Sequence, residues 1–296
     1  MTGTSVMNGP RCAASISWVT APIMAGAQAW SFSGGSAAVL VLHGFTGTPQ
    51  SMRPLAQAYA GAGFTVELPL LPGHGSALED MLPTRFDDWA GAAEFAYMEL
   101  ASRCSPVLVS GLSMGGTLAC KLVVDHPEIA AAIVINPLLD PPEQALVDLL
   151  AGLLESGEQV APGVGSDISR PGVQELAYDG TPIAAALSLF EGVGELATQL
   201  SRICCPVLLF SSRQDHVVPP SSGDLLERAA RGPLQRVWLE RSFHVATLDL
   251  DRETVEKTSV RFALEVTGGL SSLQTLETGR RGGQCPQSGR ETQPER

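Results

Sequence analysis

One serine in the sequence has neighbours that are typical of a catalytic nucleophile. Gly111-Leu112-Ser113-Met114-Gly115 matches the pattern G-x-S-x-G. The motif follows an apolar run that ends at Ser110 and precedes a run with helical spacing, so we expect a sharp strand-to-helix turn with Ser113 exposed at its tip. The alternative is a glycine-lined helix start with an inert serine, and the placement of the motif favours the nucleophile.

A serine hydroxyl needs a base to take its proton, and the sequence has five histidines that could serve. His244 lies in a predicted loop after the strand that ends near Leu239 and before the last helix, which matches the chain order serine, acid, histidine. The alternative for His244 is an ordinary surface histidine. The other four histidines are less suitable as the base. His43 directly follows the first predicted strand, and His74 lies in a loop before the serine. His126 ends the helix that follows the serine, and His216 is next to Asp215, which is the better candidate for the acid.

The acid that orients this base should follow a strand between the serine and the histidine in the chain. Asp215 follows the apolar run Pro206–Phe210 by a short polar loop. Helix capping is the alternative role, but Val217-Val218-Pro219-Pro220 postpones any helix. Three other aspartates lie in or near the predicted insertion or at a helix start and are less suitable: Asp140, Asp148 and Asp224.

Acyl transfer also needs two N–H donors aimed at the developing oxyanion. We expect these to be the backbone N–H groups of Met114 and of Phe45, the latter in the loop His43-Gly44-Phe45-Thr46-Gly47. The alternative is an ordinary glycine-rich turn. The loop lacks the glycine patterns of phosphate and dinucleotide sites, so nucleotide binding is not supported, and we expect no metal and no organic cofactor.

Apolar strands and helices alternate along the chain, which predicts a mostly parallel sheet covered by helices on both faces. The alternation stops between residues 137 and 200, where a leucine stripe over 146–154, a Gly/Pro/Ser-rich stretch and a helix from about residue 183 predict a small inserted helical cap. The stripe either covers a tunnel for an acyl chain or packs on the sheet domain. We therefore expect a disordered leader (1–21), an α/β core in two parts (22–136 and 201–267), a cap (137–200) and a disordered tail (268–296).

Composition narrows the possible partners. The 296 residues carry 31 acidic and 19 basic side chains, a net charge of −12, which repels nucleic acid and anionic lipid headgroups. The six cysteines include no C-x-x-C pair, and Cys120, Cys204 and Cys205 lie in apolar segments, so we expect reduced core thiols. No apolar run is long enough for a transmembrane helix, and the leader resembles a signal peptide only weakly. We expect a cytoplasmic protein, with secretion as the alternative.

Six segments of the sequence match a known family in the same order: His43–Met52, Gly73–Ser76, Gly111–Leu118, Glu175–Tyr178, Asp215–Pro220 and His244–Asp249. Together they resemble the bacterial monoacylglycerol lipases and related short-chain carboxylesterases of the α/β-hydrolase fold, over about residues 22–266. The resemblance implies that Ser113, Asp215 and His244 form a catalytic triad and that the N–H groups of Phe45 and Met114 form the oxyanion hole. It also implies that Glu175 binds the glycerol hydroxyls and that Val164 contacts the substrate; without the resemblance, Glu175 would be taken for a solvated charge.

The sequence therefore predicts a serine hydrolase that cleaves monoacylglycerols, small lipid esters, to fatty acid and glycerol through an acyl-enzyme. A small cap encloses one acyl chain more readily than a triacylglycerol. The nearer alternative is a general short-chain carboxylesterase or thioesterase, which the same triad would serve. The more distant alternative is a non-catalytic ligand-binding protein with this fold, which would usually have lost one of the three residues.

Overall fold

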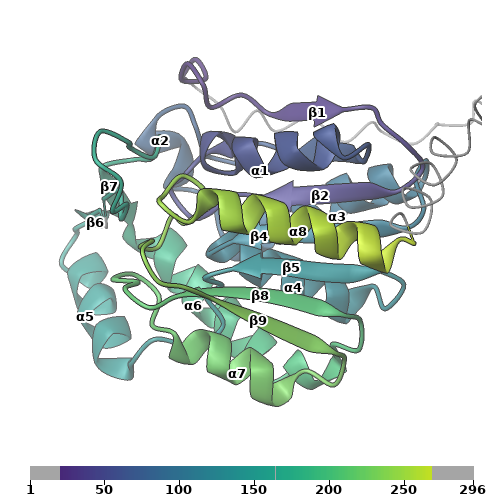
Figure 1. Cartoon of the computed structure of the whole chain (residues 1–296). Coiled ribbons are helices and arrows are strands. Elements are labelled where there is room, and N and C mark those ends of the chain that lie inside the picture. The colour runs from purple at the N-terminus through teal and green to yellow at the C-terminus, as the bar shows by residue number, and fades with distance from the viewer. Residues whose placement is uncertain (1–20, 164, 269–296) are drawn as a thin grey trace, which may run out of the picture.

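The computed structural model describes residues 21–163 and 165–268, which form a sheet with helices on both faces (Figure 1). The seven strands of this sheet lie in the order β1-β3-β2-β4-β5-β8-β9. All neighbouring strands are parallel except β1, which pairs antiparallel with β3 at the edge. The strands are β1 (Trp30–Phe32), β2 (Ala38–Leu42), β3 (Thr65–Leu68), β4 (Val107–Leu112), β5 (Ala131–Ile135), β8 (Val207–Ser212) and β9 (Leu234–Leu239).

The helices lie on the two faces of the sheet, and each face has its own apolar core. Helices α1 (Pro49–Gly61) and α8 (Arg252–Val266) pack on one face, and α3 (Phe86–Ala101), α4 (Met114–Asp125), α6 (Ile183–Ala197) and α7 (Ser221–Ala229) contribute to the other. In β2, Val39 and Val41 face the first core while Leu40 and Leu42 face the second. A strand that is buried on both faces appears in the sequence as a continuous apolar run, which is why β2 could be predicted.

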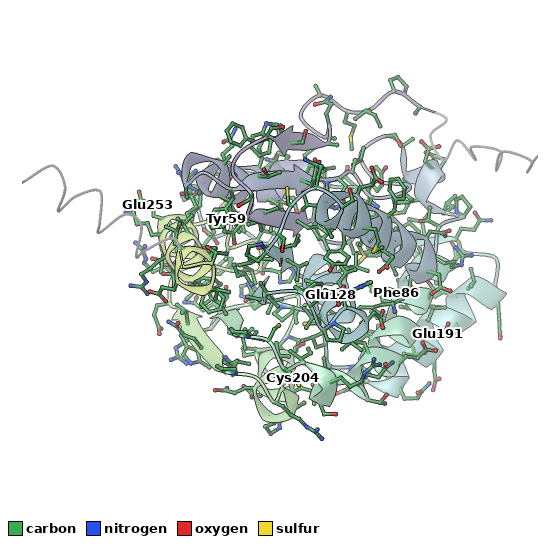
Figure 2. The ribbon with its side chains drawn as sticks, turned by 90° about the vertical axis from the view of Figure 1, so that its right-hand side faces the viewer. Tyr59, Phe86, Glu128, Glu191, Cys204 and Glu253 are labelled. Atoms are coloured by element: carbon green, nitrogen blue, oxygen red, sulfur yellow. The ribbon has the colours of Figure 1, made fainter. Side chains whose placement is uncertain are left out.

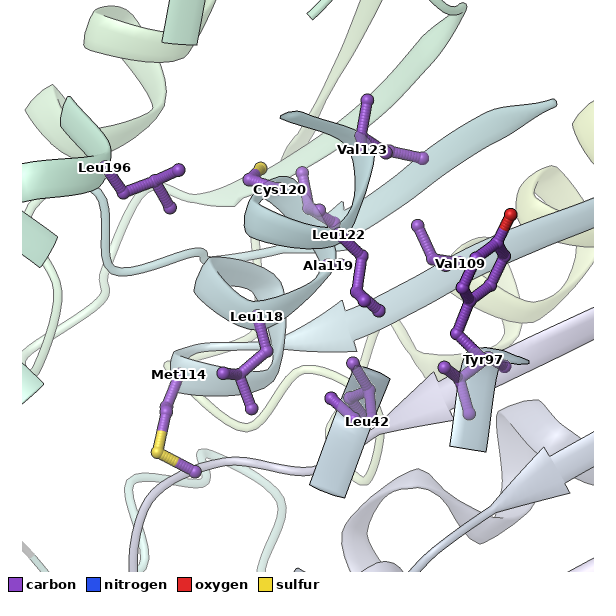
Figure 3. Packing of buried hydrophobic residues seen from close by; sticks show 14 of the residues in the cluster. Leu42, Tyr97, Val109, Met114, Leu118, Ala119, Cys120, Leu122, Val123 and Leu196 are labelled. Atoms are coloured by element: carbon purple, nitrogen blue, oxygen red, sulfur yellow. The ribbon is translucent and has the colours of Figure 1, made fainter. Parts of the chain in front are cut away.

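Helix α4, which follows Ser113, is the most deeply buried of the described helices that contact the sheet. Leu118 and Leu122 lie close to the strand residues Leu42 and Val109 in the same core (Figure 3). Ten of the twelve residues of α4 are buried. The helix that begins at the candidate nucleophile is therefore held firmly by packing.

The predicted cap lies between β5 and β8. It contains α5 (Gln144–Glu155), a hairpin of β6 (Val160–Pro162) and β7 (Gly180–Pro182), and α6. Helix α5 packs mainly on α6. In the leucine stripe, Leu146 and Leu149 are 43% and 59% exposed and Leu150 is buried, so both alternatives for the stripe stay predictions.

Other sequence expectations have mixed outcomes. Cys120 is a buried free thiol, as expected, and Cys205 is half-buried, but Cys204, labelled in Figure 2, is exposed, so the prediction of a core thiol is wrong there. The short helix α2 (Leu78–Met81) and the 3₁₀ turn η1 (Leu200–Arg202) complete the elements.

Among the residues that the structure describes, no helix combines the length and apolar character needed to cross a bilayer. The predictions for residues 1–20 and 269–296 lie outside the described residues.

Candidate active site

Ser113 occupies a strained turn between β4 and α4. Its backbone has φ 56° and ψ −120°, a conformation that non-glycine residues rarely adopt. A side chain at Gly111 would overlap the carbonyl of Gly115, and one at Gly115 would overlap the carbonyl of Leu42. The Ser113 N–H donates to the carbonyl of Ile135 at 3.0 Å, which ties the turn to the end of β5. The glycines of the motif are therefore required by the close approach of backbone to backbone.

His244 and Asp215 form a buried pair. The imidazole Nδ1 lies 2.8 Å from Asp215 Oδ2, and the two side chains are 8% and 1% exposed. The other carboxylate oxygen, Oδ1, accepts the N–H groups of Val217 at 2.9 Å and Val218 at 2.8 Å. Because the carboxylate is held from both sides, it fixes the ring of His244 and leaves Nε2 as the nitrogen that can accept a proton.

Asn136 connects the loop of His244 to the end of the sheet. This residue directly follows Ile135, has φ 43° and is buried. Its Nδ2 donates to the His244 carbonyl at 2.8 Å, and its Oδ1 accepts the N–H of Ser212 at 2.7 Å. Two consecutive residues at the end of β5 therefore bind the two loops: Ile135 bonds Ser113, and Asn136 bonds His244.

The predicted oxyanion loop passes beside Ser113. A Cβ at Gly44 would lie 3.5 Å from the Cβ of Ser113. His43 Nδ1 donates to the Gly44 carbonyl at 2.9 Å, and its Nε2 accepts the N–H of Leu71 at 3.1 Å. The Gly44 carbonyl and the Phe45 N–H belong to one peptide plane, so the His43 ring holds the plane that carries the expected donor.

His43 and His74 form a buried histidine pair behind this loop. Their ring centroids are 5.0 Å apart, and burial lowers the pKa of His43 to about 3 and that of His74 to about 4. His43 must be neutral because a protonated Nε2 could not accept the Leu71 N–H. His74 Nδ1 donates to the Pro72 carbonyl at 2.9 Å, and Trp89 Nε1 donates to the same oxygen at 3.1 Å.

These two histidines predict a loss of stability in acid. In the unfolded chain they titrate near pH 6.5, so below that pH the unfolded state binds more protons than the folded state. The free energy of unfolding should therefore fall by about 1.4 kcal/mol per pH unit for each histidine as the pH decreases from 6.5 towards 4. His74→Phe keeps an aromatic ring in place, and Trp89 still bonds the Pro72 carbonyl.

Urea unfolding at pH 8, 6.5 and 5 measures this effect. Between pH 6.5 and pH 5, His74→Phe should lose about 1.5 kcal/mol less stability than the wild type, because one of the two titrating rings is gone. Equal losses in the two proteins would show that His74 does not titrate on unfolding.

The remaining histidines lie away from Ser113 or have other partners. His126, at the end of α4, lies 2.7 Å from a carboxylate oxygen of Glu94 and 3.2 Å from one of Glu128. His216 Nδ1 lies 2.8 Å from Asp167. Of the five histidines, His244 is the one that the structure pairs with Asp215.

Glu175 lies beside the oxyanion loop. A Cβ at Gly47 would lie 2.6 Å from Glu175 Oε1. Burial raises the pKa of this carboxyl, while attraction to His244 and a hydrogen bond from Ser51 oppose the shift. The half-buried Glu175 side chain therefore reaches the oxyanion loop. Val164 lies outside the described residues.

The described residues hold no group of three or more His, Cys, Asp or Glu side chains arranged to bind a metal ion.

The family model described as "Serine aminopeptidase, S33" matches residues 35–251. The chain belongs to the serine aminopeptidase S33 family. A solved structure from a study of LipS and LipT, "two metagenome-derived lipolytic enzymes", has 39% identity and a TM-score of 0.79, and the match covers 82% of this chain and 100% of that one. The predicted α/β-hydrolase fold is thereby confirmed.

Two curated relatives extend the comparison for this S33-family chain. A thermostable monoacylglycerol lipase of Bacillus sp. (strain H-257) is 43% identical over 250 residues, which is 83% of this chain and 98% of the relative. A carboxylesterase of Bacillus subtilis (strain 168) is 26% identical over 235 residues, 79% of this chain and 94% of the relative. The family resemblance stated from the motifs is therefore confirmed.

Sequence reasoning missed several polar residues that position the site in this S33-family chain. Their side chains are buried or partly buried and bond the backbone of the His244 loop. Asn136 and Ser212 donate to carbonyl oxygens of this loop, and Asp167 and Asp249 accept its N–H groups. Asn136 carried one signal, since a polar residue at the end of a buried strand lies at the carboxyl edge of the sheet, where ligands bind in such folds. Asp167 lies in a Gly/Pro/Ser-rich stretch and carried none.

Proposed function

We propose that the protein is a serine ester hydrolase that cleaves monoacylglycerols to a fatty acid and glycerol. The observation that carries the proposal is the hydrogen-bonded pair of His244 and Asp215 on the same sheet edge as the strained Ser113 turn. A buried imidazole held by a carboxylate is the base that a serine nucleophile needs. We also propose that a single small lipid ester is the substrate.

The reaction follows from these positions. Ser113 Oγ attacks the ester carbonyl while His244 Nε2 takes its proton, and Asp215 stabilises the imidazolium that forms. The N–H groups of Phe45 and Met114 stabilise the oxyanion. His244 then protonates the departing glycerol oxygen, and water, activated by the same imidazole, releases the fatty acid from the acyl-enzyme.

The preference for a glycerol ester is supported by Glu175. Its carboxylate is close to Gly47 of the oxyanion loop. A carboxylate there can accept hydrogen bonds from the free hydroxyls of a monoacylglycerol, and such charge-assisted bonds are strong. The 43% identity to a monoacylglycerol lipase supports the same substrate class. The contact of Val164 with substrate stays a prediction from the resemblance.

A general carboxylesterase is the second candidate, and the similarity to the Bacillus subtilis carboxylesterase favours it. Such an enzyme would use the same serine, acid and base. The two candidates differ only in whether the alcohol part of the ester is recognised.

The test compares initial rates on monoacylglycerols and on simple alkyl esters with the same acyl chains, for wild type, Glu175→Ala and Glu175→Gln. We expect kcat/KM of the wild type to favour monoacylglycerols, and Glu175→Ala to remove roughly 10-fold to 100-fold of that preference, because hydrogen bonds to a charged group contribute about 1.5–3 kcal/mol. Glu175→Gln should keep part of it. Rates on the alkyl esters should change little.

Glu158→Ala is the matched control, because Glu158 is an exposed carboxylate of the same cap. It should leave the preference unchanged. If wild type hydrolyses alkyl esters as well as monoacylglycerols, and Glu175→Ala changes neither, the protein is a general carboxylesterase.

We also infer a reducing, cytoplasmic location from the cysteines. Cys104 and Cys120 are buried free thiols, and free buried thiols are typical of proteins kept under reducing conditions.

A further inference from the structure

One segment of the cap contacts both loops that carry the candidate catalytic groups. Residues 165–178, here called the tether segment, follow the β6 strand and lead to β7. At one end, the Tyr178 N–H donates to the carbonyl of Thr46 in the oxyanion loop at 3.1 Å, and the Leu176 N–H donates to Gln50 Oε1 at 3.0 Å. At the other end, the tether segment meets the loops of Asp215 and His244. It therefore spans the site.

Asp167 makes the contact with these two loops. Its Oδ2 accepts the backbone N–H of His244 at 3.0 Å and that of His216 at 3.2 Å. Its Oδ1 lies 2.8 Å from Nδ1 of His216, and its own carbonyl accepts the N–H of Val245 at 3.1 Å. The Asp167 side chain is only 14% exposed. A single carboxylate thus binds the backbone N–H of His216, which directly follows Asp215, and that of His244.

A second carboxylate fixes the tether segment in register with the His244 loop. Asp249 Oδ2 accepts the N–H groups of Ser169 and Phe243, both at 2.8 Å, and Oδ1 accepts the N–H of Arg170 at 2.8 Å. Asp249 belongs to the base loop and bonds the tether segment, whereas Asp167 belongs to the tether segment and bonds the base loop. The two carboxylates therefore resist sliding of one segment past the other.

We propose that Asp167 is a positioning residue for the Asp215–His244 pair. The inference rests on the proposed roles of Ser113, Asp215 and His244. Asp215 and His244 come from separate loops, and the bond between Oδ2 and Nδ1 survives only while these loops keep their spacing. Both loops donate an N–H to the same oxygen of Asp167, so that oxygen sets the spacing. The cap thereby contributes to the rate of the reaction as well as to the choice of substrate.

The expected cost of losing Asp167 is large because catalytic groups tolerate little displacement. Groups that act on a reacting atom must be held to within about 0.5 Å, and a misplacement of about 1 Å can lower a rate about 100-fold. Asp167 touches neither the ester nor the reacting oxygen in this proposal. Its loss should therefore lower kcat while KM changes little.

Three variants test the proposal in the full-length protein. For Asp167→Ala, we expect kcat to fall roughly 10-fold to 100-fold with KM within about 2-fold of wild type. Asp167→Asn keeps one acceptor oxygen for the two backbone N–H groups and should recover most of kcat. Asp167→Glu keeps the charge but moves the carboxylate by one methylene, so kcat should again fall. The proton NMR resonance of His244 Nδ1–H, strongly downfield when bound to a carboxylate, should weaken in Asp167→Ala and Asp167→Glu.

His216→Ala is the matched control. It removes the exposed imidazole next to Asp167 Oδ1 but leaves both backbone N–H bonds, so kcat should stay within about 2-fold of wild type. A folded Asp167→Ala protein with wild-type kcat and an unchanged downfield resonance would overturn the proposal. If Asp167→Ala does not fold, the other two variants decide, and equal kcat for Asp167→Asn and Asp167→Glu would overturn it.

The same experiments separate this inference from the proposed function. Ser113→Ala is assayed beside the Asp167 variants. If Ser113→Ala keeps its activity, the proposed function fails. If Ser113→Ala is inactive while Asp167→Ala is folded and fully active, only the role of Asp167 fails.

Discussion

Ser113→Ala is expected to lower kcat for ester hydrolysis by about 10⁴-fold to 10⁶-fold. The substitution removes the oxygen that attacks the ester, so His244, Asp215 and the oxyanion donors have no nucleophile to assist. The fold should be unaffected, because the turn is held by the Ser113 backbone bond to Ile135 and by the glycines around it, none of which involves the hydroxyl. Any residual rate would come from the oxyanion donors and from substrate binding.

The measurement combines kcat on a monoacylglycerol with covalent labelling by a fluorophosphonate, which reacts with an activated serine. The variant should label negligibly, and its thermal unfolding midpoint should stay close to that of wild type. Ser102→Ala is the control, since Ser102 is an exposed serine at the end of α3 that bonds a helix carbonyl. A Ser113→Ala protein that keeps more than a tenth of wild-type kcat would refute the nucleophile.

Asp215→Asn is expected to lower kcat by about 10⁴-fold. The two N–H donors of Val217 and Val218 determine how the new amide must lie, because they need an acceptor at the position of Oδ1. The amide oxygen therefore takes that position, and the NH₂ group faces Nδ1 of His244. The imidazole must then carry its proton on Nε2, where it cannot accept the proton of Ser113.

This loss should appear in kcat at every pH at which the wild type is active, and the fold should be retained because the side chain keeps its shape. Asp140→Asn provides the control: Asp140 is an exposed aspartate that bonds Ser221. If Asp215→Asn retained more than a tenth of the activity, the orienting carboxylate would have to be another group beside the base, and Asp167 would be the first to examine.

The sequence predicted the features that depend on local pattern. The buried strands appear as continuous apolar runs because both faces of the sheet are covered, and the serine turn is marked by its glycines. The pairing of Asp215 with His244 was also predictable, because chain order in this fold places both after strands at one edge of the sheet. The match to the family model and the 43% identity to a monoacylglycerol lipase confirm the family that these patterns indicated.

The features that escaped prediction depend on partners far away in the chain. Asn136 binds the carbonyl of His244, 108 residues later, and Asp167 binds its N–H, 77 residues later. Neither residue has a neighbour whose type or spacing reveals such a bond. The edge strand β1 and the β6–β7 hairpin were missed because three residues are too few to show a period.

The tether segment and the part of the cap that precedes it differ in how freely their sequences can change. Helix α5 and strand β6 make their described hydrogen bonds within the cap, so we expect that this first part can be exchanged, lengthened or shortened while the pair of Asp215 and His244 stays intact. The second part, residues 165–178, is joined to Thr46, Gln50 and the base loop, and cannot be replaced as an independent module. A chimera that retunes substrate choice should therefore join its foreign sequence before Gly165, not at the outer ends of the insertion.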